Sequence, residues 1–373
     1  MTAQTHQSFF QMYGETLTAD TVAAPSTALL HAGSTRNLGD AAIMAAVAEM
    51  SPERHVSVAL GDNNPINIPG LSVSSNIGGS KRYVSVGGDI FHNDRPWLCT
   101  RAFLESVRQL SKNANKTIVF GQTIPTSCGW LGLRLLTTAL HRARAVVVRD
   151  RESYGLLRRS GIDVDLAFDA AFGLTPTDSA IAVARTQFAA LNVDPNRTVL
   201  LSVRSCDTIP GRSANLYYAR MARLADLLVT RGHQVVVLVQ SAANTNDSDS
   251  QIAYALKRDV PEVQVMDLFA YPGTFDRVAV LIGVMAIANI VVSARYHGAV
   301  LRLVSGRQPY HLHTSQKSRD LHTRLGLTGC ALDHFHPDDA IPAIEATAAP
   351  TFNATPIRDD VRNAFDRAYA KIA

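Results

Sequence analysis

The sequence is poor in cysteine and in charged residues. It has four cysteines among 373 residues, and no two of them have the CxxC spacing of a redox or zinc motif. We therefore predict unpaired cysteines in a reducing compartment. Charged residues make up 18% and hydrophobic residues 46% of the chain. This balance argues against intrinsic disorder and predicts a folded globular protein with substantial cores.

A secretory leader and a long hydrophobic run are also missing. The opening segment MTAQTHQSFFQMYGETL has neither a basic start nor an apolar core. The stretch that most resembles a membrane span, Val278–Ala294, is short for that purpose and contains Gly283 and Asn289. We interpret it as a buried helix, a turn near residues 288–289, and a strand. We expect a cytoplasmic protein, and contact with the inner face of the plasma membrane stays open.

Motifs of several function classes are absent as well. There is no P-loop and no GxSxG elbow. The net charge of +4 is small and no Lys/Arg block occurs, so we predict no nucleic-acid partner. Histidine pairs occur at His311/His313 and His334/His336, but without an HExxH motif or a cysteine cluster, so we predict no metal. The weakly positive charge suits an anionic small molecule.

What the sequence does contain is a regular alternation of strand-like and helix-like segments. Apolar runs such as 117–122 and 198–204 alternate with amphipathic runs such as 96–113. This pattern predicts an α/β fold with two doubly wound, Rossmann-like domains that face a cleft. We place the domains at 1–185 and 186–345 and a C-terminal helix at 346–373. One arrangement open to this helix is to pack back on the first domain.

Two turns containing glycine follow predicted strands. In STRNLGDAAI, Asn37, Gly39 and Asp40 stand between a strand and a helix. Gly39 lets a ligand approach the backbone closely, whereas Asp40 equally suits an ordinary helix N-cap. In SVGGDIFHND, Gly87 and Gly88 permit a tight turn or a close ligand contact. Neither turn forms the complete dinucleotide fingerprint.

Basic side chains recur where predicted strands end or helices begin. They are Arg149, Arg204, Arg295, His297 and Lys317. Each has an alternative interpretation as a solvated or salt-bridged charge. Because ligands of open α/β sheets bind outside the carboxyl ends of the strands, we expect these side chains to meet at one cleft. Several cations there predict a ligand that carries phosphate or carboxylate. We also expect a helix N-terminus directly after Arg295 to add to their positive charge.

The ordered set of motifs resembles one known family. The segments STRNLGDAAI, VGGD, VVVRDRESYGLLRRSGI, DLAFDAAFGL, LLSVR and VVSARYHGAVL, followed by Lys317, are similar to those of the polysaccharide pyruvyl transferases, over about Leu29 to Leu327. The resemblance implies a fold like that of GT-B glycosyltransferases. It also implies transfer of a pyruvyl group from phosphoenolpyruvate to a sugar, with a ketal formed across two hydroxyls, in cell-surface polysaccharide biosynthesis.

The resemblance also implies partners and residue roles. Phosphoenolpyruvate would be a co-substrate with no further cofactor, bound on the C-terminal side. A sugar or lipid-linked oligosaccharide acceptor would bind on the N-terminal side. The implied donor-binding residues are Arg149, His297 and Lys317. Arg295 and Arg204 would lie close by, and the turn at residues 37–40 would face the same cleft. Asp89 stands where a third glycine is frequent, and Tyr296 where an aliphatic residue is usual, and these departures concern the acceptor.

Elementary chemistry agrees with this donor. Phosphoenolpyruvate carries a phosphate and a carboxylate and so needs two cationic clamps. Pyruvyl transfer requires a proton at the methylene carbon and removal of hydroxyl protons, and a carboxylate would stabilise the oxocarbenium-like centre. We expect acid–base chemistry from His297, since histidine titrates near neutral pH, or phosphate binding alone. Asp40 is the second candidate for the base.

Two other functions are compatible with the same residues. One is a glycosyltransferase or nucleotide-sugar enzyme of GT-B type, which would bind a nucleotide sugar in place of phosphoenolpyruvate. The other is a non-catalytic relative that binds an anionic glycan or serves as a scaffold. No oligomeric state is predicted from the sequence.

Overall fold

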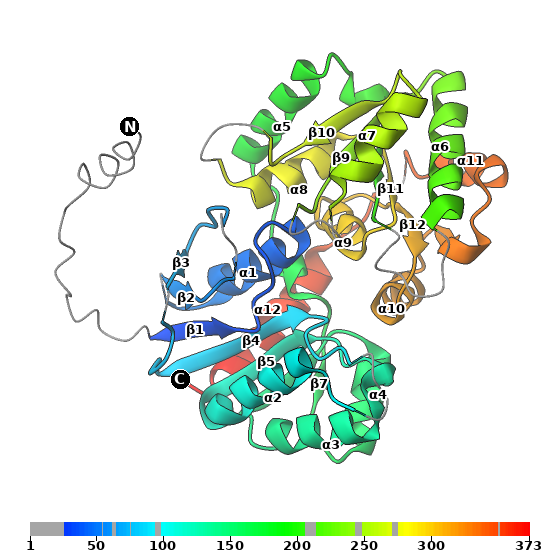
Figure 1. Cartoon of the computed structure of the whole chain (residues 1–373). Helices are drawn as coiled ribbons and strands as arrows, with labels where there is room; N and C mark the ends of the chain where they lie inside the picture. The colour runs from blue at the N-terminus through cyan, green and yellow to red at the C-terminus, as the bar shows by residue number, and fades with distance from the viewer. Residues whose placement is uncertain are drawn as a thin grey trace, which may run out of the picture.

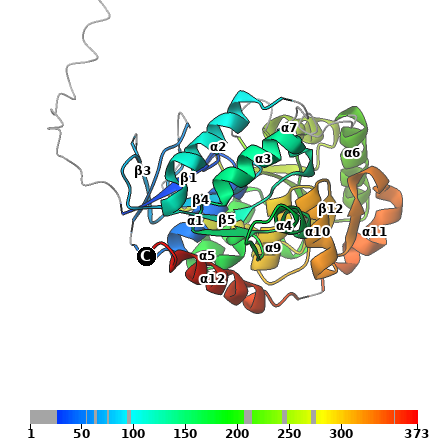
Figure 2. The ribbon, with the colours of Figure 1, turned by 90° about the horizontal axis from the view of Figure 1, so that it is seen from below.

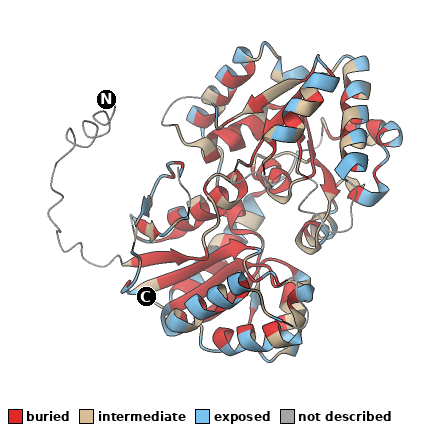
Figure 3. Ribbon diagram, viewed as in Figure 1, coloured by how far each residue is buried: buried red, intermediate tan, exposed pale blue. Residues whose placement is uncertain are grey.

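The computed structural model describes residues 26–53, 55–61, 65–74, 76–93, 98–205, 214–242, 248–270, 275–349 and 351–373. These residues form two sheets of parallel strands with helices packed against them (Figure 1). The predicted α/β class with two doubly wound, Rossmann-like sheets is confirmed. The central strands of both sheets are buried along most of their length, as Figure 3 shows, because helices cover both faces of a parallel sheet.

The first sheet has seven strands in the order β3-β2-β1-β4-β5-β6-β7. Its strands are β1 (Thr27–Leu30), β2 (Val56–Val58), β3 (Leu71–Val73), β4 (Arg82–Gly88), β5 (Thr117–Gln122), β6 (Ala145–Val148) and β7 (Asp165–Leu166). The helices that connect them are α1 (Leu38–Met50), α2 (Arg101–Asn113), α3 (Gly129–Leu140) and α4 (Arg151–Arg159). The short edge strand β3 is not among the strands predicted from sequence, because its largely exposed side chains lack an apolar run.

The second sheet has six strands in the order β10-β9-β8-β11-β12-β13. Its strands are β8 (Thr198–Ser202), β9 (Gln234–Val239), β10 (Gln264–Asp267), β11 (Ile290–Ser293), β12 (Tyr310–His313) and β13 (Gly329–Ala331). The remaining α-helices are α5 (Asp178–Ala190), α6 (Ala214–Thr230), α7 (Ser250–Asp259), α8 (Arg277–Ile287), α9 (Tyr296–Val304), α10 (Gln316–Leu325), α11 (Pro337–Ala346) and α12 (Thr355–Tyr369).

Both sheets share the same topology and therefore the same kind of binding edge. The strand order reverses between β1 and β4 in the first sheet, and between β8 and β11 in the second. Ligands of such sheets bind at this switch point, just beyond the carboxyl ends of the two strands. The segments that follow these four strands are therefore where a site is expected.

The two sheets share a continuous hydrophobic core. The largest cluster of buried side chains contains Leu29 of β1 and Leu200 of β8. The last helix, α12, is drawn in red in Figures 1 and 2 and contacts β5 and β6 of the first sheet. Phe365 of α12 and Phe120 of β5 meet edge to face, with ring centroids 5.1 Å apart.

The apolar stretch Val278–Ala294 divides as its sequence predicts. It contains most of α8, a turn at Ala288, and then β11. The buried guanidinium of Arg302 donates hydrogen bonds to the carbonyl oxygens of Ala288 and Asn289, each at 2.9 Å. Within the described residues, no helix has the length and apolar character required to span a membrane.

Candidate functional site

A cavity of about 210 Å³ lies where the carboxyl ends of the two sheets meet. The residues that line it follow β1, β4, β8, β9 and β11, or begin α10. They are Asn37, Gly39, Asp40, Gly88, Asp89, Arg204, Gln240, Arg295, Tyr296, His297 and Lys317. The structure thus brings to one place the switch-point segments of both sheets.

Two residues of the predicted site do not line this cavity. Gly87 packs against β5, where a Cβ atom would lie 2.5 Å from the carbonyl oxygen of Gly121. Arg149 is fully buried just behind the cavity, with Nη2 3.5 Å from Oδ1 of the lining residue Asp89. The other predicted residues all border the cavity, and their proposed roles stay predictions.

The turn before α1 connects the two halves of the chain. The side chain of Asn37 is the N-cap of α1 and accepts a hydrogen bond from the Gly39 amide at 3.1 Å. The alternative in which Asp40 is the N-cap is therefore wrong, and Asp40 lies in the first turn of α1, facing the cavity. The Leu38 amide donates to the carbonyl oxygen of Gln240 at 2.9 Å, which holds this turn against the end of β9.

The expected helix N-terminus is present after β11. Arg295 is the N-cap residue of α9, and His297 lies in the first turn of that helix. Arg295 Nε donates to Asp249 Oδ1 at 3.0 Å and to the Val203 carbonyl oxygen at 3.1 Å. Burial raises the pKa of Asp249, while the charge of Arg295 opposes that rise. The buried carboxylate thus orients the guanidinium at the rim of the cavity.

Gln240 supplies an orphaned hydrogen-bond donor to the cavity. Its side-chain oxygen contacts the Ser202 hydroxyl, and its backbone amide donates to Asp249 Oδ2 at 3.0 Å. Its side-chain Nε2 is buried and has no hydrogen-bond partner among the described residues. A buried donor without a partner is costly, and a ligand oxygen in the cavity would satisfy it.

His297 lies beside a buried ion pair of Asp169 and Arg149. Asp169, which follows β7, accepts a hydrogen bond from Arg149 Nη1 at 2.6 Å and lies 3.5 Å from His297 Nε2. Burial acts to raise the pKa of Asp169, but the charge and hydrogen bonding of His297 and the charge of Arg149 hold that pKa well below its ordinary value. The Asp169 carboxylate therefore stays ionised beside the imidazole of His297.

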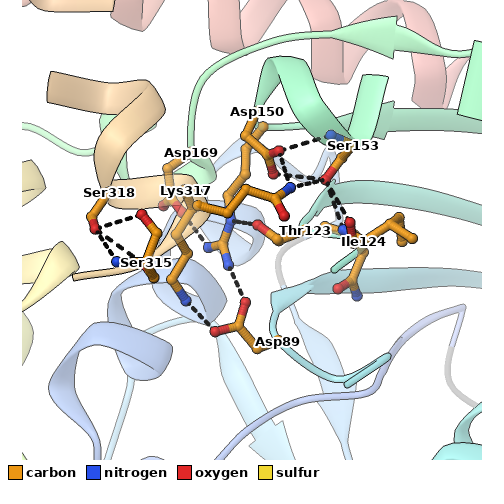
Figure 4. A network of polar contacts seen from close by, with 12 residues as sticks. Asp89, Thr123, Ile124, Asp150, Ser153, Asp169, Ser315, Lys317 and Ser318 are labelled. Carbon is orange, nitrogen blue, oxygen red and sulfur yellow. Dashed lines mark hydrogen bonds and ion pairs between the residues drawn. The ribbon is translucent and has the colours of Figure 1, made fainter. Parts of the chain in front are cut away.

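Lys317 reaches across from α10 to the end of β4. Its Nζ lies 2.6 Å from Asp89 Oδ2. Figure 4 shows the two side chains pointing toward each other. The ring of Tyr296 lies 5.4 Å from Lys317 Nζ and 5.2 Å from the guanidinium carbon of Arg149. Burial lowers the pKa of Lys317, and the charge of Asp89 opposes that change. Both cations are therefore held by the face of one tyrosine ring and by the carboxylate of Asp89.

α10 makes further contacts with the first sheet's helices. Gln316 Nε2 donates to Asp150 Oδ1 at 2.7 Å, and Arg319 pairs with Glu152 at 2.6 Å. These contacts hold α10 against the start of α4.

Sequence reasoning missed several residues that build this site. Asp89 and Tyr296 could have been found, because each directly adjoins a predicted site residue at a strand end. Gln240 also ends an apolar run, but its side chain carries no charge to mark it. Asp169 and Asp249 give no local signal that they will face Arg149 and Arg295.

No group of three or more His, Cys, Asp or Glu side chains that could hold a metal ion occurs in the described part of the chain. The two histidine pairs singled out in the sequence therefore form no such group there. The predicted absence of a metal requirement stays a prediction.

Two doubly wound sheets that meet at a polar cavity define an architecture of GT-B type. A family model described as polysaccharide pyruvyl transferase matches residues 37–312, and this chain belongs to that family. The family resemblance seen in the sequence is therefore confirmed.

Solved structures with a similar fold include UDP-GlcNAc 2-epimerases. The enzyme from Methanocaldococcus jannaschii has a TM-score of 0.55 and 10% identity, covering 92% of this chain and 99% of the other. The enzyme from Rickettsia bellii has a TM-score of 0.55 and 8% identity, covering 92% and 95%. The Neisseria meningitidis enzyme bound to UDP-GlcNAc has a TM-score of 0.51 and 10% identity, covering 92% and 99%. No curated protein sequence matches this chain.

Proposed function

We propose that this protein transfers the pyruvyl group of phosphoenolpyruvate to two hydroxyls of a sugar, forming a ketal and releasing phosphate. The observation that carries the proposal is the cavity, which gathers four basic side chains around a small volume of about 210 Å³. They are Arg204, Arg295, His297 and Lys317. A three-carbon acid with a phosphate and a carboxylate matches such a set of cations.

Within this set, different side chains suit the two ends of phosphoenolpyruvate. Arg295 presents a planar fork that Asp249 orients, and the Gln240 amide beside it offers a donor to the same ligand, so this side suits the carboxylate. Lys317 and the first turn of α9 offer a point charge and a helix N-terminus, which suit the phosphate.

The reaction balances with these groups alone. One acceptor hydroxyl attacks C2 of the donor while the methylene carbon gains a proton, giving a tetrahedral intermediate. The C2–O bond to phosphate then breaks, the phosphate leaves with the electron pair, and the second hydroxyl closes the ketal. The two hydroxyl protons end on the new methyl group and on the phosphate. His297, beside Asp169, would accept a hydroxyl proton.

A panel of sugar acceptors tests the proposal. We expect the purified protein to release inorganic phosphate from phosphoenolpyruvate only when a suitable sugar diol, free or lipid-linked, is present. In D₂O the product ketal would carry one deuterium in its methyl group, which distinguishes transfer from simple hydrolysis. Thermal stabilisation by UDP-GlcNAc and none by phosphoenolpyruvate would favour a nucleotide-sugar enzyme instead.

A further inference from the structure

Two carboxylates face the cavity from neighbouring strands of the first sheet. Asp89 directly follows β4, and Asp40 lies in the first turn of the helix that follows β1. Because β1 and β4 are adjacent at the switch point, the two side chains border the same small volume. Paired carboxylates whose surroundings differ can take opposite roles in one reaction.

The surroundings of Asp89 favour its ionised form. Its carboxylate pairs with Lys317 at 2.6 Å and with Arg149 at 3.5 Å, and its side chain is 51% exposed. The positive charges of Lys317 and Arg149 hold the pKa of Asp89 well below its ordinary value. Asp89 therefore carries a fixed negative charge beside the cations in Figure 4.

The surroundings of Asp40 favour its protonated form. Its carboxylate makes no ion pair with any described residue, although it lies close to several charges. Burial raises the pKa of Asp40, and the negative charge of Asp89 acts in the same direction. His297, Lys317 and Arg149 oppose that rise without cancelling it. A half-buried carboxyl at the edge of a cavity can hold a proton and deliver it to a ligand there.

The position of Asp40 is set by a glycine. A Cβ atom at Gly33, in the loop after β1, would lie 2.5 Å from Asp40 Oδ2 and 2.8 Å from its Cγ. The loop therefore passes directly beside the carboxyl group, and only a residue without a side chain leaves Asp40 where it is.

We propose that Asp40 delivers the proton to the methylene carbon of phosphoenolpyruvate, and that Asp89 remains an anion which positions Lys317 and faces the cationic centre at C2. The inference rests on the proposed function. The Asp40 O–H bond breaks as the C3–H bond forms from the electron pair of the C2–C3 double bond, and the acceptor oxygen adds to C2. Asp40 is left as a carboxylate, and it regains a proton from the second acceptor hydroxyl as the ketal closes.

The assignment leaves His297 with the first hydroxyl proton. Its ring lies beside the ionised Asp169, which stabilises the imidazolium that this proton forms. After the C2–O bond breaks, the imidazolium gives that proton to the departing phosphate. His297 thus accepts the proton of the first hydroxyl, and Asp40 accepts the proton of the second.

The experiment compares Asp40→Asn, Asp40→Glu and Asp89→Asn with Asp163→Asn, a matched control whose side chain is 96% exposed. Phosphate release, deuterium in the product methyl group, and phosphoenolpyruvate binding by calorimetry are measured for each. For Asp40→Asn we expect a loss in kcat of about 100-fold or more with retained donor binding. Asp40→Glu keeps a proton donor and should restore part of the rate.

Asp89→Asn should change donor binding and kcat in opposite directions. Removing the competing carboxylate should tighten binding of phosphoenolpyruvate or inorganic phosphate, because Lys317 then meets only the ligand, while kcat falls. A purely structural role would instead lower the melting temperature and weaken binding. That second result overturns the role of Asp89.

The rate against pH separates the outcomes for Asp40. If Asp40 must be protonated for turnover, kcat of the wild type falls as pH rises. Asp40→Asn should not show this decrease of kcat with pH. Asp40→Asn with the kcat and pH profile of Asp163→Asn overturns the inference and leaves the proposed function standing. A wild-type protein that forms no deuterated ketal with any acceptor overturns both.

Discussion

The imidazole of His297 lies directly against the backbone of Gly39. A Cβ atom at position 39 would be 2.6 Å from His297 Cγ and 2.8 Å from its Cβ, and closer still to Nδ1. The two residues come from opposite halves of the chain, one at the start of α1 and the other at the start of α9. The imidazole of His297 thus occupies the space that a side chain at position 39 would fill. The backbone of Gly39 therefore helps to fix the orientation of the imidazole.

Gly39→Ala should therefore inactivate the protein by displacing His297. We expect phosphate release from phosphoenolpyruvate to fall by about 100-fold or more, which is the usual contribution of a positioned acid–base group. Gly61→Ala is the matched control, because nothing lies within 4 Å of a Cβ atom at that position. Equal activity of the two variants would show that the orientation of His297 does not matter.

His297→Ala should give a stable but inactive protein. His297 Nε2 lies 3.5 Å from Asp169 Oδ2, but Asp169 keeps its hydrogen bond from Arg149 at 2.6 Å when the imidazole is removed, so the folded state should lose little stability. Melting curves and phosphate release are measured on the same preparation. A variant that melts much earlier yet keeps its turnover below that temperature would mean that His297 has a structural role only.

Arg295→Lys should impair the protein even though it keeps the charge. A lysine cannot form the contacts that Arg295 Nε makes with both Asp249 and the Val203 carbonyl oxygen. We expect a higher KM for phosphoenolpyruvate, because an ammonium replaces the planar fork that would hold the carboxylate. An unchanged KM would indicate that the donor carboxylate binds elsewhere.

Gln240→Ala should weaken donor binding with little effect on folding. A hydrogen bond to a charged group contributes about 1.5–3 kcal/mol, so we expect Kd for phosphoenolpyruvate to rise about tenfold or more. Gln251→Ala, on the exposed side of α7, is the matched control. Calorimetric titration of both variants decides the matter, and identical affinities would remove Gln240 from the site.

The free energy of unfolding should decrease on acidification below neutral pH. Burial lowers the pKa of His31 to about 4, where its ring contacts the Ser85 hydroxyl and the Ser106 carbonyl oxygen, each at 2.8 Å. Between the ordinary histidine value of about 6.5 and this lower value, the unfolded chain binds a proton that the folded state does not. Stability is therefore complete above about pH 6.5 and falls by about 1.4 kcal/mol per pH unit as pH decreases toward 4.

Urea unfolding between these pH values checks this prediction. His31→Gln, which cannot titrate, should show a shallower dependence on pH than the wild type. His55→Gln is the control, because His55 is exposed and its removal should leave the slope unchanged. Burial likewise lowers the pKa of His311 to about 3, so part of the acid sensitivity should persist in His31→Gln.

Much of the fold could be read from local sequence. The alternation of apolar strands such as 117–122 with amphipathic helices predicts parallel sheets, because each pattern suits only one backbone periodicity. The edge strand β3 escaped prediction since an exposed strand lacks that pattern. The basic residues after β8 and β11 could also be predicted from local sequence. The strand ends on one edge of a parallel sheet converge, whatever the rest of the chain does.

The sequence by itself thus determined most of the elements, and it predicted the sheet edge at which the cavity lies and most of the basic residues that line it. Tertiary structure alone decided which groups pair across that edge. Asp249 reaches Arg295, and Asp169 reaches Arg149 and His297, only because two separately wound sheets pack together. Whether a carboxyl such as Asp40 holds its proton depends on its burial and on charges brought from distant segments, and neither property belongs to any local stretch of residues.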